Sequence, residues 1–374
     1  TGTTLSDNND ITADATGNTA TSAITADSGL DLVQAAAAQA GLAIDATNND
    51  VSGDLIVSSS QEIDAIEAGG ALIMSGLVST AETSTLVEGL DGATVTLSNS
   101  DQASTATGNS AASSISSLDT TASITASTAV SNLQAILGDS AIDATTVSSG
   151  IGILSGADSS NSELGDVTDS TISLRDNAQT ATATGSVSTQ SIALDASTIT
   201  GEGLAADTGE NKSGLFADGD AIIGNVQTID AEVSVFGGLG NNIIGSQIAL
   251  DADNRDVTTS TIEVTGNTQA ATATGVSTSN TLSLTSGATM NAAGAVASVQ
   301  SVDGDVFASA VGNGIGNVND AGNDLTDSTL LTADNDVTST ATGASASNSL
   351  ESTTATNNLD VATNAGLVNN SISN

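Results

Sequence analysis

The stretch Thr182-Ala183-Thr184-Gly185 decides the fold, because close copies of it stand at four other places in the chain. The copies are Asp14-Ala15-Thr16-Gly17, Thr105-Ala106-Thr107-Gly108, Thr272-Ala273-Thr274-Gly275 and Thr340-Ala341-Thr342-Gly343. In four of the five copies an asparagine stands eight residues before the glycine, at Asn9, Asn177, Asn267 and Asn335. Seven residues after it stands Ile24, Ile115, Ile192, Leu282 or Leu350. Self-similarity at long intervals is typical of a stacked repeat protein.

The residues around Gly185 alternate with the period of a β-strand. Ala181, Ala183 and Gly185 fall on one face of such a strand, and Thr182 and Thr184 fall on the other. The small face would let a second sheet approach closely, and Thr suits a pleated surface. We expect the glycine itself to lie at a bend or at a close approach of two backbones.

Two further phrases recur in the same order around these copies. The first lies upstream, and its copies begin 19 residues before their glycines, at Asp166, Asp256 and Asp324. The second lies downstream, at Val226–Asp230 and Val299–Asp303, with weaker echoes at 60–64 and 133–136. The glycines are 91, 77, 90 and 68 residues apart, so the modules share an order of strands but differ in their insertions.

These patterns predict an all-β fold, and a β-solenoid (β-helix) built of repeated modules is our first interpretation. The whole of residues 1–374 would form one elongated domain of five imperfect modules, centred on Gly17, Gly108, Gly185, Gly275 and Gly343. At roughly 20 to 30 residues per rung, with rungs about 4.8 Å apart, the body would be about 60 to 90 Å long. Tandem β-sandwich domains, one for each module, are the alternative fold.

One segment has a composition that favours a helix. Leu30 to Ile44 contains four consecutive alanines, Ala35–Ala38. Alanine favours helix strongly, so a short helix is one interpretation, and another strand with a small face is the other.

Composition limits the chemistry that this chain can perform. It has 44 acidic and 3 basic residues, a formal net charge of −41, and no His, Cys, Pro, Trp or Tyr. Such a surface repels nucleic acid, and the lack of His removes Ser-His and Cys-His catalysis. We therefore expect no enzyme. A glycan-active β-helix enzyme that uses two carboxylates is a remote alternative, because aromatic platforms for sugars are missing. Disorder would suit the charge, but the alternating apolar residues argue against it.

Calcium is the one cofactor that the residues leave open. Gly237 to Ile244 resembles the glycine-rich nonapeptide of RTX calcium β-rolls, with Asn242 where that family has Asp. Ala321 to Leu325 is a weaker echo. The candidate ligands are Asn241, Asn242 and Asp324, and plain tight turns are the competing interpretation. Otherwise we expect no cofactor.

The Thr pairs also resemble the flat face of ice-binding β-solenoids. They recur once in each module, however, which on short rungs would leave most rungs without a pair. We therefore interpret them as ordinary solvent-facing threonines.

The pattern of Asn, then Gly eight residues later, then a polar residue and Ile or Leu resembles the β-strand-repeat surface proteins of Alphaproteobacteria, including holdfast-anchor adhesins secreted with curlin-like partners. The resemblance implies an extracellular, fibre-forming protein without enzymatic activity. Curlin's own Gln-x-Gly-x-x-Asn core is reproduced by no copy in this chain.

From both lines of reasoning we expect a structural subunit of an extracellular filament or surface matrix, in adhesion or biofilm scaffolding. Segments 1–17 and 343–374 would join copies end to end. The partners would be the chain itself, outer-membrane secretion or anchoring proteins, and polysaccharide. A calcium-dependent surface-layer or adhesin stalk protein is the alternative. The chain starts at Thr1, which favours a removed secretion signal, and no apolar run is long enough to span a membrane.

Overall fold

The computed structural model describes residues 2–26, 32–33, 38–44, 47–64, 72–76, 82–87, 90–118, 123–138, 140–145, 150–155, 167–200, 220–236, 247–251, 257–309, 314–318, 325–354 and 366–373. Within these ranges the chain is all-β, with strands and turns and no helix. It follows that no helix in the described part could span a membrane. The sheets are parallel, apart from one antiparallel hairpin of β4 (Ala38–Ile44) and β5 (Thr47–Gly53).

Six parallel sheets each take strands from successive modules. The longest contains β2 (Asp10–Ala26), β11 (Asp101–Leu118), β18 (Ala178–Thr200), β24 (Thr268–Asn291) and β30 (Asp336–Thr354), with β3 (Leu32–Val33) and β12 (Ser123–Thr125) at one end. Before it in each module come β1 (Thr3–Asp7), β10 (Thr94–Ser98), β17 (Thr171–Arg175), β23 (Thr261–Thr265) and β29 (Thr329–Ala333). After it come β6 (Leu55–Asp64), β13 (Thr128–Leu137), β19 (Ala221–Ile229), β25 (Gly294–Val302) and β31 (Gly366–Ser373).

Three smaller sheets complete the path of the chain. One contains β7 (Leu72–Gly76), β14 (Ala141–Thr145), β20 (Glu232–Phe236) and β26 (Val306–Ser309). The next contains β8 (Glu82–Val87), β15 (Gly150–Ser155), β21 (Gln247–Asp251) and β27 (Gly314–Val318). The last contains β9 (Leu90–Asp91), β16 (Val167–Thr168), β22 (Val257–Thr258) and β28 (Leu325–Thr326).

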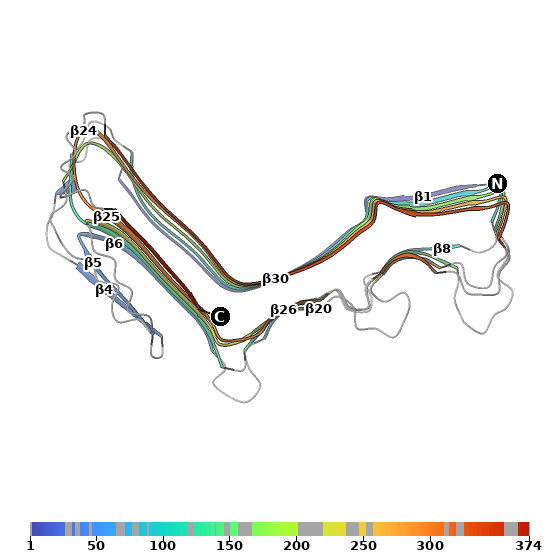
Figure 1. Cartoon of the computed structure of the whole chain (residues 1–374), viewed down its shortest axis with the longest axis horizontal. Coiled ribbons are helices and arrows are strands. Elements are labelled where there is room, and N and C mark those ends of the chain that lie inside the picture. The colour runs from blue at the N-terminus through green and yellow to red at the C-terminus, as the bar shows by residue number, and fades with distance from the viewer. Residues whose placement is uncertain are drawn as a thin grey trace.

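The strands of one module form one layer, and the layers stack in register. Thr16, Thr107, Thr184, Thr274 and Thr342 are register partners in successive layers. Figure 1 shows corresponding strands of successive modules lying together along the same long path, which bends several times. The sheets therefore run through the modules, as in a β-solenoid, whereas tandem sandwiches would keep each sheet within one module.

The expected rung of 20 to 30 residues is wrong, because one layer takes the 68 to 91 residues that separate successive glycines. Five layers about 4.8 Å apart give a stack about 24 Å thick, and not 60 to 90 Å. The extra residues lengthen the path within each layer (Figure 1). The Thr pairs need the same correction, because each layer is one module and not several short rungs. The second threonine forms a row through all five layers, from Thr16 to Thr342, whereas the row of the first threonine ends at Asp14 in the first layer.

The expected close approach at the glycines is confirmed. A methyl group at Gly108 would lie 2.5 Å from the carbonyl oxygen of Gly185, and one at Gly185 would lie 2.5 Å from that of Gly275. The alternation of buried residues also shifts by one residue here, since Gly185 and Ser186 are both buried. At this line of stacked glycines, the glycine column, the positions that face the core therefore shift by one residue.

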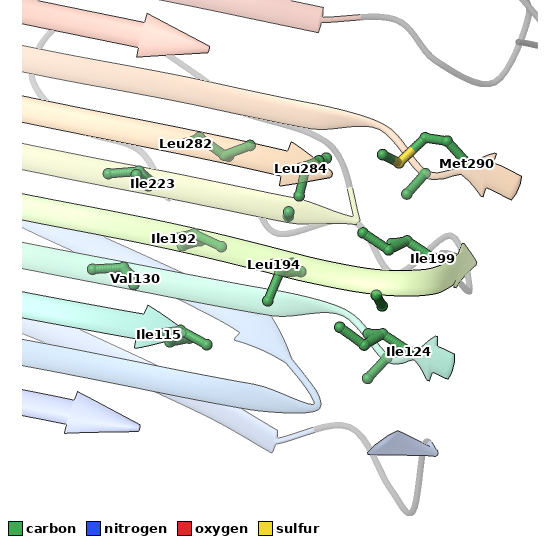
Figure 2. Packing of buried hydrophobic residues seen from close by; sticks show 14 of the residues in the cluster. Ile115, Ile124, Val130, Ile192, Leu194, Ile199, Ile223, Leu282, Leu284 and Met290 are labelled. Atoms are coloured by element: carbon green, nitrogen blue, oxygen red, sulfur yellow. The ribbon is translucent and has the colours of Figure 1, made fainter. Parts of the chain in front are cut away.

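The small alanine face packs as its composition predicts. Ala183 and Ala273 lie in a buried cluster with Ile229, Val233 and Val235 of the facing sheets. Beyond the glycine, larger side chains fill the space between the sheets. Figure 2 shows these aliphatic rows, which repeat from layer to layer: Ile115, Ile192 and Leu282; Ile124, Ile199 and Met290; Val130 and Ile223.

The segment from Leu30 to Ile44 contributes the strands β3 and β4. The helical interpretation is therefore wrong for those residues, and Ala35–Ala37 lie outside the described ranges. In the described part of this segment, the β4–β5 hairpin and the pairing of β3 with β12 supply the backbone partners that a helix would otherwise provide.

Candidate assembly interface

An asparagine ladder joins the layers at the corner before the long strands. The backbone N–H and the side-chain Nδ2 of Asn177 both donate to Oδ1 of Asn267, over 3.1 and 2.9 Å. Asn267 donates in the same way to Oδ1 of Asn335, with both distances 3.0 Å. The backbone N–H of Ser100 donates to Oδ1 of Asn177 over 3.0 Å. The ladder therefore has a direction, because each layer donates to the following one.

The residue before each of these corner positions has a left-handed backbone. These residues are Asn8 (φ 55°), Asn99 (φ 49°), Asp176 (φ 55°), Gly266 (φ 68°) and Asp334 (φ 55°). Gly, Asn and Asp are the residues that adopt this conformation at least cost. A left-handed residue followed by asparagine thus makes this corner in four layers, and Asn99 followed by Ser100 makes it in the second layer. The four asparagines are the ones that the sequence repeats singled out.

A glutamine ladder runs through the core between the two long sheets. Gln134 Nε2 donates to Oε1 of Gln61 over 2.7 Å, Gln227 Nε2 to Gln134 over 2.9 Å, and Gln300 Nε2 to Gln227 over 3.0 Å. Each also donates to a backbone carbonyl of the facing sheet, as Gln300 does to Ser345 over 2.9 Å. These four glutamines belong to the downstream phrase, and Gln61 and Gln134 come from its two less similar copies.

Asn225 is the centre of a second buried polar group, which the sequence patterns did not single out. Its Oδ1 accepts hydrogen bonds from Asn132 Nδ2, Ser188 Oγ and Gln190 Nε2, over 2.8, 3.0 and 3.1 Å. The signal was present as Asn-x-Gln, since Asn132 and Asn225 each stand two residues before a ladder glutamine. Such networks join the two sheets at a defined register.

The outermost layers differ from the inner ones in exposure. Leu5 in the first layer is 64% exposed, and Leu331 and Val337 in the last are 41% and 48% exposed. Ile262, the register partner of the exposed Leu330, is only 1% exposed one layer inward. Among the described strands, β2 and β30 each pair on one side only. The two outer layers are therefore faces that a further layer could cover.

In the described part of the chain, two carboxyl groups have pKa values shifted in opposite directions. Asn99 Nδ2 and Ser98 Oγ donate to Oδ1 of Asp7, over 2.7 and 2.9 Å, and these bonds lower the pKa of Asp7. Burial raises the pKa of Asp143, and the hydrogen bond from the Ser234 hydroxyl offsets this rise only in part.

The raised pKa of Asp143 predicts a gain of stability on acidification. The protonated form is favoured in the folded protein, so its contribution is complete below the ordinary pKa of 3.8 and is lost as the pH rises through the raised folded value. Asp143→Asn should therefore raise the melting temperature at pH 7 and lose this advantage by about pH 3. Thermal unfolding monitored by circular dichroism from pH 3 to 8 measures the difference. Asp91→Asn removes the same charge from an exposed position; an equal gain in this control would contradict the role of burial.

The structure brings together no metal ligands in the described ranges, where it contains no group of three or more Asp, Glu, His or Cys side chains placed to hold an ion. The calcium candidates Asn241, Asn242 and Asp324 lie outside the described residues. An open hollow of about 450 Å³ lies beside β26 and β30, and its polar side chains are those of Asp303 and Asp305.

No protein-family model, curated protein or solved structure matches this chain.

Proposed function

We propose that this chain is a structural subunit whose outer layers stack on those of further copies to form a filament or surface matrix. In this proposal the parallel stack is a β-solenoid, and polymerisation extends it. The observation that carries the proposal is the exposure of Leu5, Leu331 and Val337 on the two outer layers, at strand edges that can accept another parallel strand.

The polar ladders support the same function. The asparagine ladder passes hydrogen bonds from each layer to the next, so an added layer would continue it. Identical side chains stacked in this way are typical of very stable β-fibres. A location outside the cell, a role in adhesion or biofilm, and contacts with polysaccharide or anchoring proteins belong to the proposal through the resemblance to β-strand-repeat surface proteins.

Charge sets the conditions for assembly. A net charge of −41 makes copies repel each other, and salt screens that repulsion as the Debye length falls from about 10 Å at 0.1 M to about 3 Å at 1 M. We therefore expect assembly to increase with salt.

Negative-stain electron microscopy of the purified 374-residue chain, at low and high salt and with and without EDTA, tests the proposal. We expect filaments that lengthen with salt and survive EDTA. Fibre diffraction should show the strand spacing of about 4.8 Å along the filament axis. Single particles under all conditions would overturn the proposal, and filaments that dissolve in EDTA would favour the calcium-dependent surface protein instead.

A further inference from the structure

We infer that copies of this chain join head to tail in one register, with β29 and β30 of one copy pairing in parallel with β1 and β2 of the next. The inference rests on the proposed function and adds to it the partner surface, its direction and its register. It comes from positions at which both outer layers differ from the inner layers in the same way.

The first such position lies near the start of the long strands. The inner layers carry Gln102, Gln179 and Gln269, whose side chains are buried and form a ladder: Gln179 Nε2 donates to Gln102 over 3.1 Å, and Gln269 Nε2 donates to Gln179 over 2.9 Å. In the first and last layers the same register position holds Ile11 and Val337.

An aliphatic residue at both ends of a glutamine ladder cannot continue its hydrogen bonds. Head-to-tail stacking would instead place Val337 on Ile11, so that two apolar side chains cover each other. Val337 is 48% exposed in the single chain, and this contact would bury it.

A second position, in the preceding short strands, shows the same change. The inner layers carry Thr96, Ser173 and Glu263, whereas the first and last layers carry Leu5 and Leu331. The two leucines are 64% and 41% exposed. In-register stacking would pair them, and a slip of two residues would place Leu331 against Thr3 or Asp7.

The asparagine ladder specifies the direction. Each Oδ1 accepts from the layer before it, and Asn335 stands in the last layer while Asn9 stands at the same position in the first. A following copy would present Asn9 to Asn335 as Asn335 is presented to Asn267. Two first layers facing each other about a two-fold axis would have to pair antiparallel, which breaks this direction.

A head-to-tail contact of this kind is heterologous and does not close on itself, so it generates an open filament. The junction also places Asp336 beside Asp10, as the first two layers already place Asp10 beside Asp101. Screening of this pair adds to the expected effect of salt.

Disulfide trapping tests the register, because the chain contains no cysteine. Thr16 and Thr342 share a register position on the outward face of the long sheet. Across the junction their Cα atoms would be about 4.8 Å apart, within the range of a disulfide. Mild oxidation of assembled Thr16→Cys/Thr342→Cys protein should give a ladder of covalent multimers on a non-reducing gel.

Thr16→Cys/Thr338→Cys is the matched control, with a cysteine on the same face but displaced along the strand by four residues, or about 13 Å. It should remain monomeric on the gel. A 1:1 mixture of the two single variants, Thr16→Cys and Thr342→Cys, should stop at dimers.

The outcomes separate this inference from the proposed function. Filaments in which Thr16→Cys/Thr342→Cys does not cross-link, or in which the displaced pair does, would overturn the register and leave the filament standing. Covalent dimers of either single variant alone would show two-fold pairing and overturn the head-to-tail direction. An absence of filaments in the unmodified chain would overturn the proposed function itself.

A second variant tests the apolar contact. Val337→Asp should raise the critical concentration for assembly at least tenfold, with the melting temperature of the unassembled protein unchanged. Thr338→Asp adds the same charge to the neighbouring residue, on the opposite face of the strand, and should have a much smaller effect. Equal effects of the two variants would overturn the contact between Val337 and Ile11.

Discussion

Replacing Gly185 with alanine is expected to lower the free energy of unfolding by about 3 kcal/mol. The added methyl group would stand 2.5 Å from the carbonyl oxygen of Gly275, against Cδ1 of Ile229, and 3.1 Å from Cγ2 of Val233. The neighbouring layer cannot retreat easily, because the strands on both sides of the glycine pair in register. Urea denaturation of the unassembled protein, monitored by circular dichroism, measures the loss.

Gly2→Ala is the matched control, since a methyl group at Gly2 would meet nothing within 4 Å. It should change the free energy of unfolding by less than about 0.5 kcal/mol. If Gly185→Ala were as mild as this control, the layers would not approach each other at the glycine column as the structure has them.

Replacing Asn225 with alanine is expected to cost about 3 to 5 kcal/mol. Asn132, Ser188 and Gln190 would each lose the oxygen to which they donate, between two sheets where little water can replace it. The substitution also leaves space for a cavity, which adds to the cost. The same denaturation experiment applies, and the slope against urea should stay constant if the folded state is otherwise intact.

Asn348→Ala is the control for this prediction. Asn348 also accepts a side-chain hydrogen bond, from Asn280 Nδ2 over 2.7 Å, but it lies in the last layer and is only half-buried. Its replacement should cost about 1 kcal/mol in the unassembled protein. Equal costs at the two positions would contradict the role of Asn225 as a buried acceptor of three bonds.

Much of the local structure followed from the residues. The alternation around Gly185 predicted the small and the hydroxyl-bearing faces of the strand, because side chains alternate with period two whatever the strand pairs with. The asparagines before the glycines and the glutamines of the downstream phrase were identified by repetition, and the structure stacks them in ladders.

The size of a layer did not follow in the same way. The sequence shows that Gly108, Gly185 and Gly275 lie in similar motifs. A solenoid with several short rungs in each module and one with a single long layer in each module would both contain such repeated motifs. Which strand pairs with which is a long-range choice, and the 68 to 91 residues between partners carry insertions without a shared pattern. The spacing of the glycines was the one clue to the layer length, because it equals the number of residues in a layer.

The candidate interface was predicted in part. The expectation that terminal segments 1–17 and 343–374 join copies stays a prediction, and the contrast of Ile11 and Val337 with the inner glutamines became visible only when the register aligned them. The sequence by itself determined the strands, their faces and the glycine column, because these depend on local alternation and side-chain size. Only the tertiary structure decided the layer length, the Asn225 network and the exposed outer faces, because each depends on contacts between residues far apart in the chain.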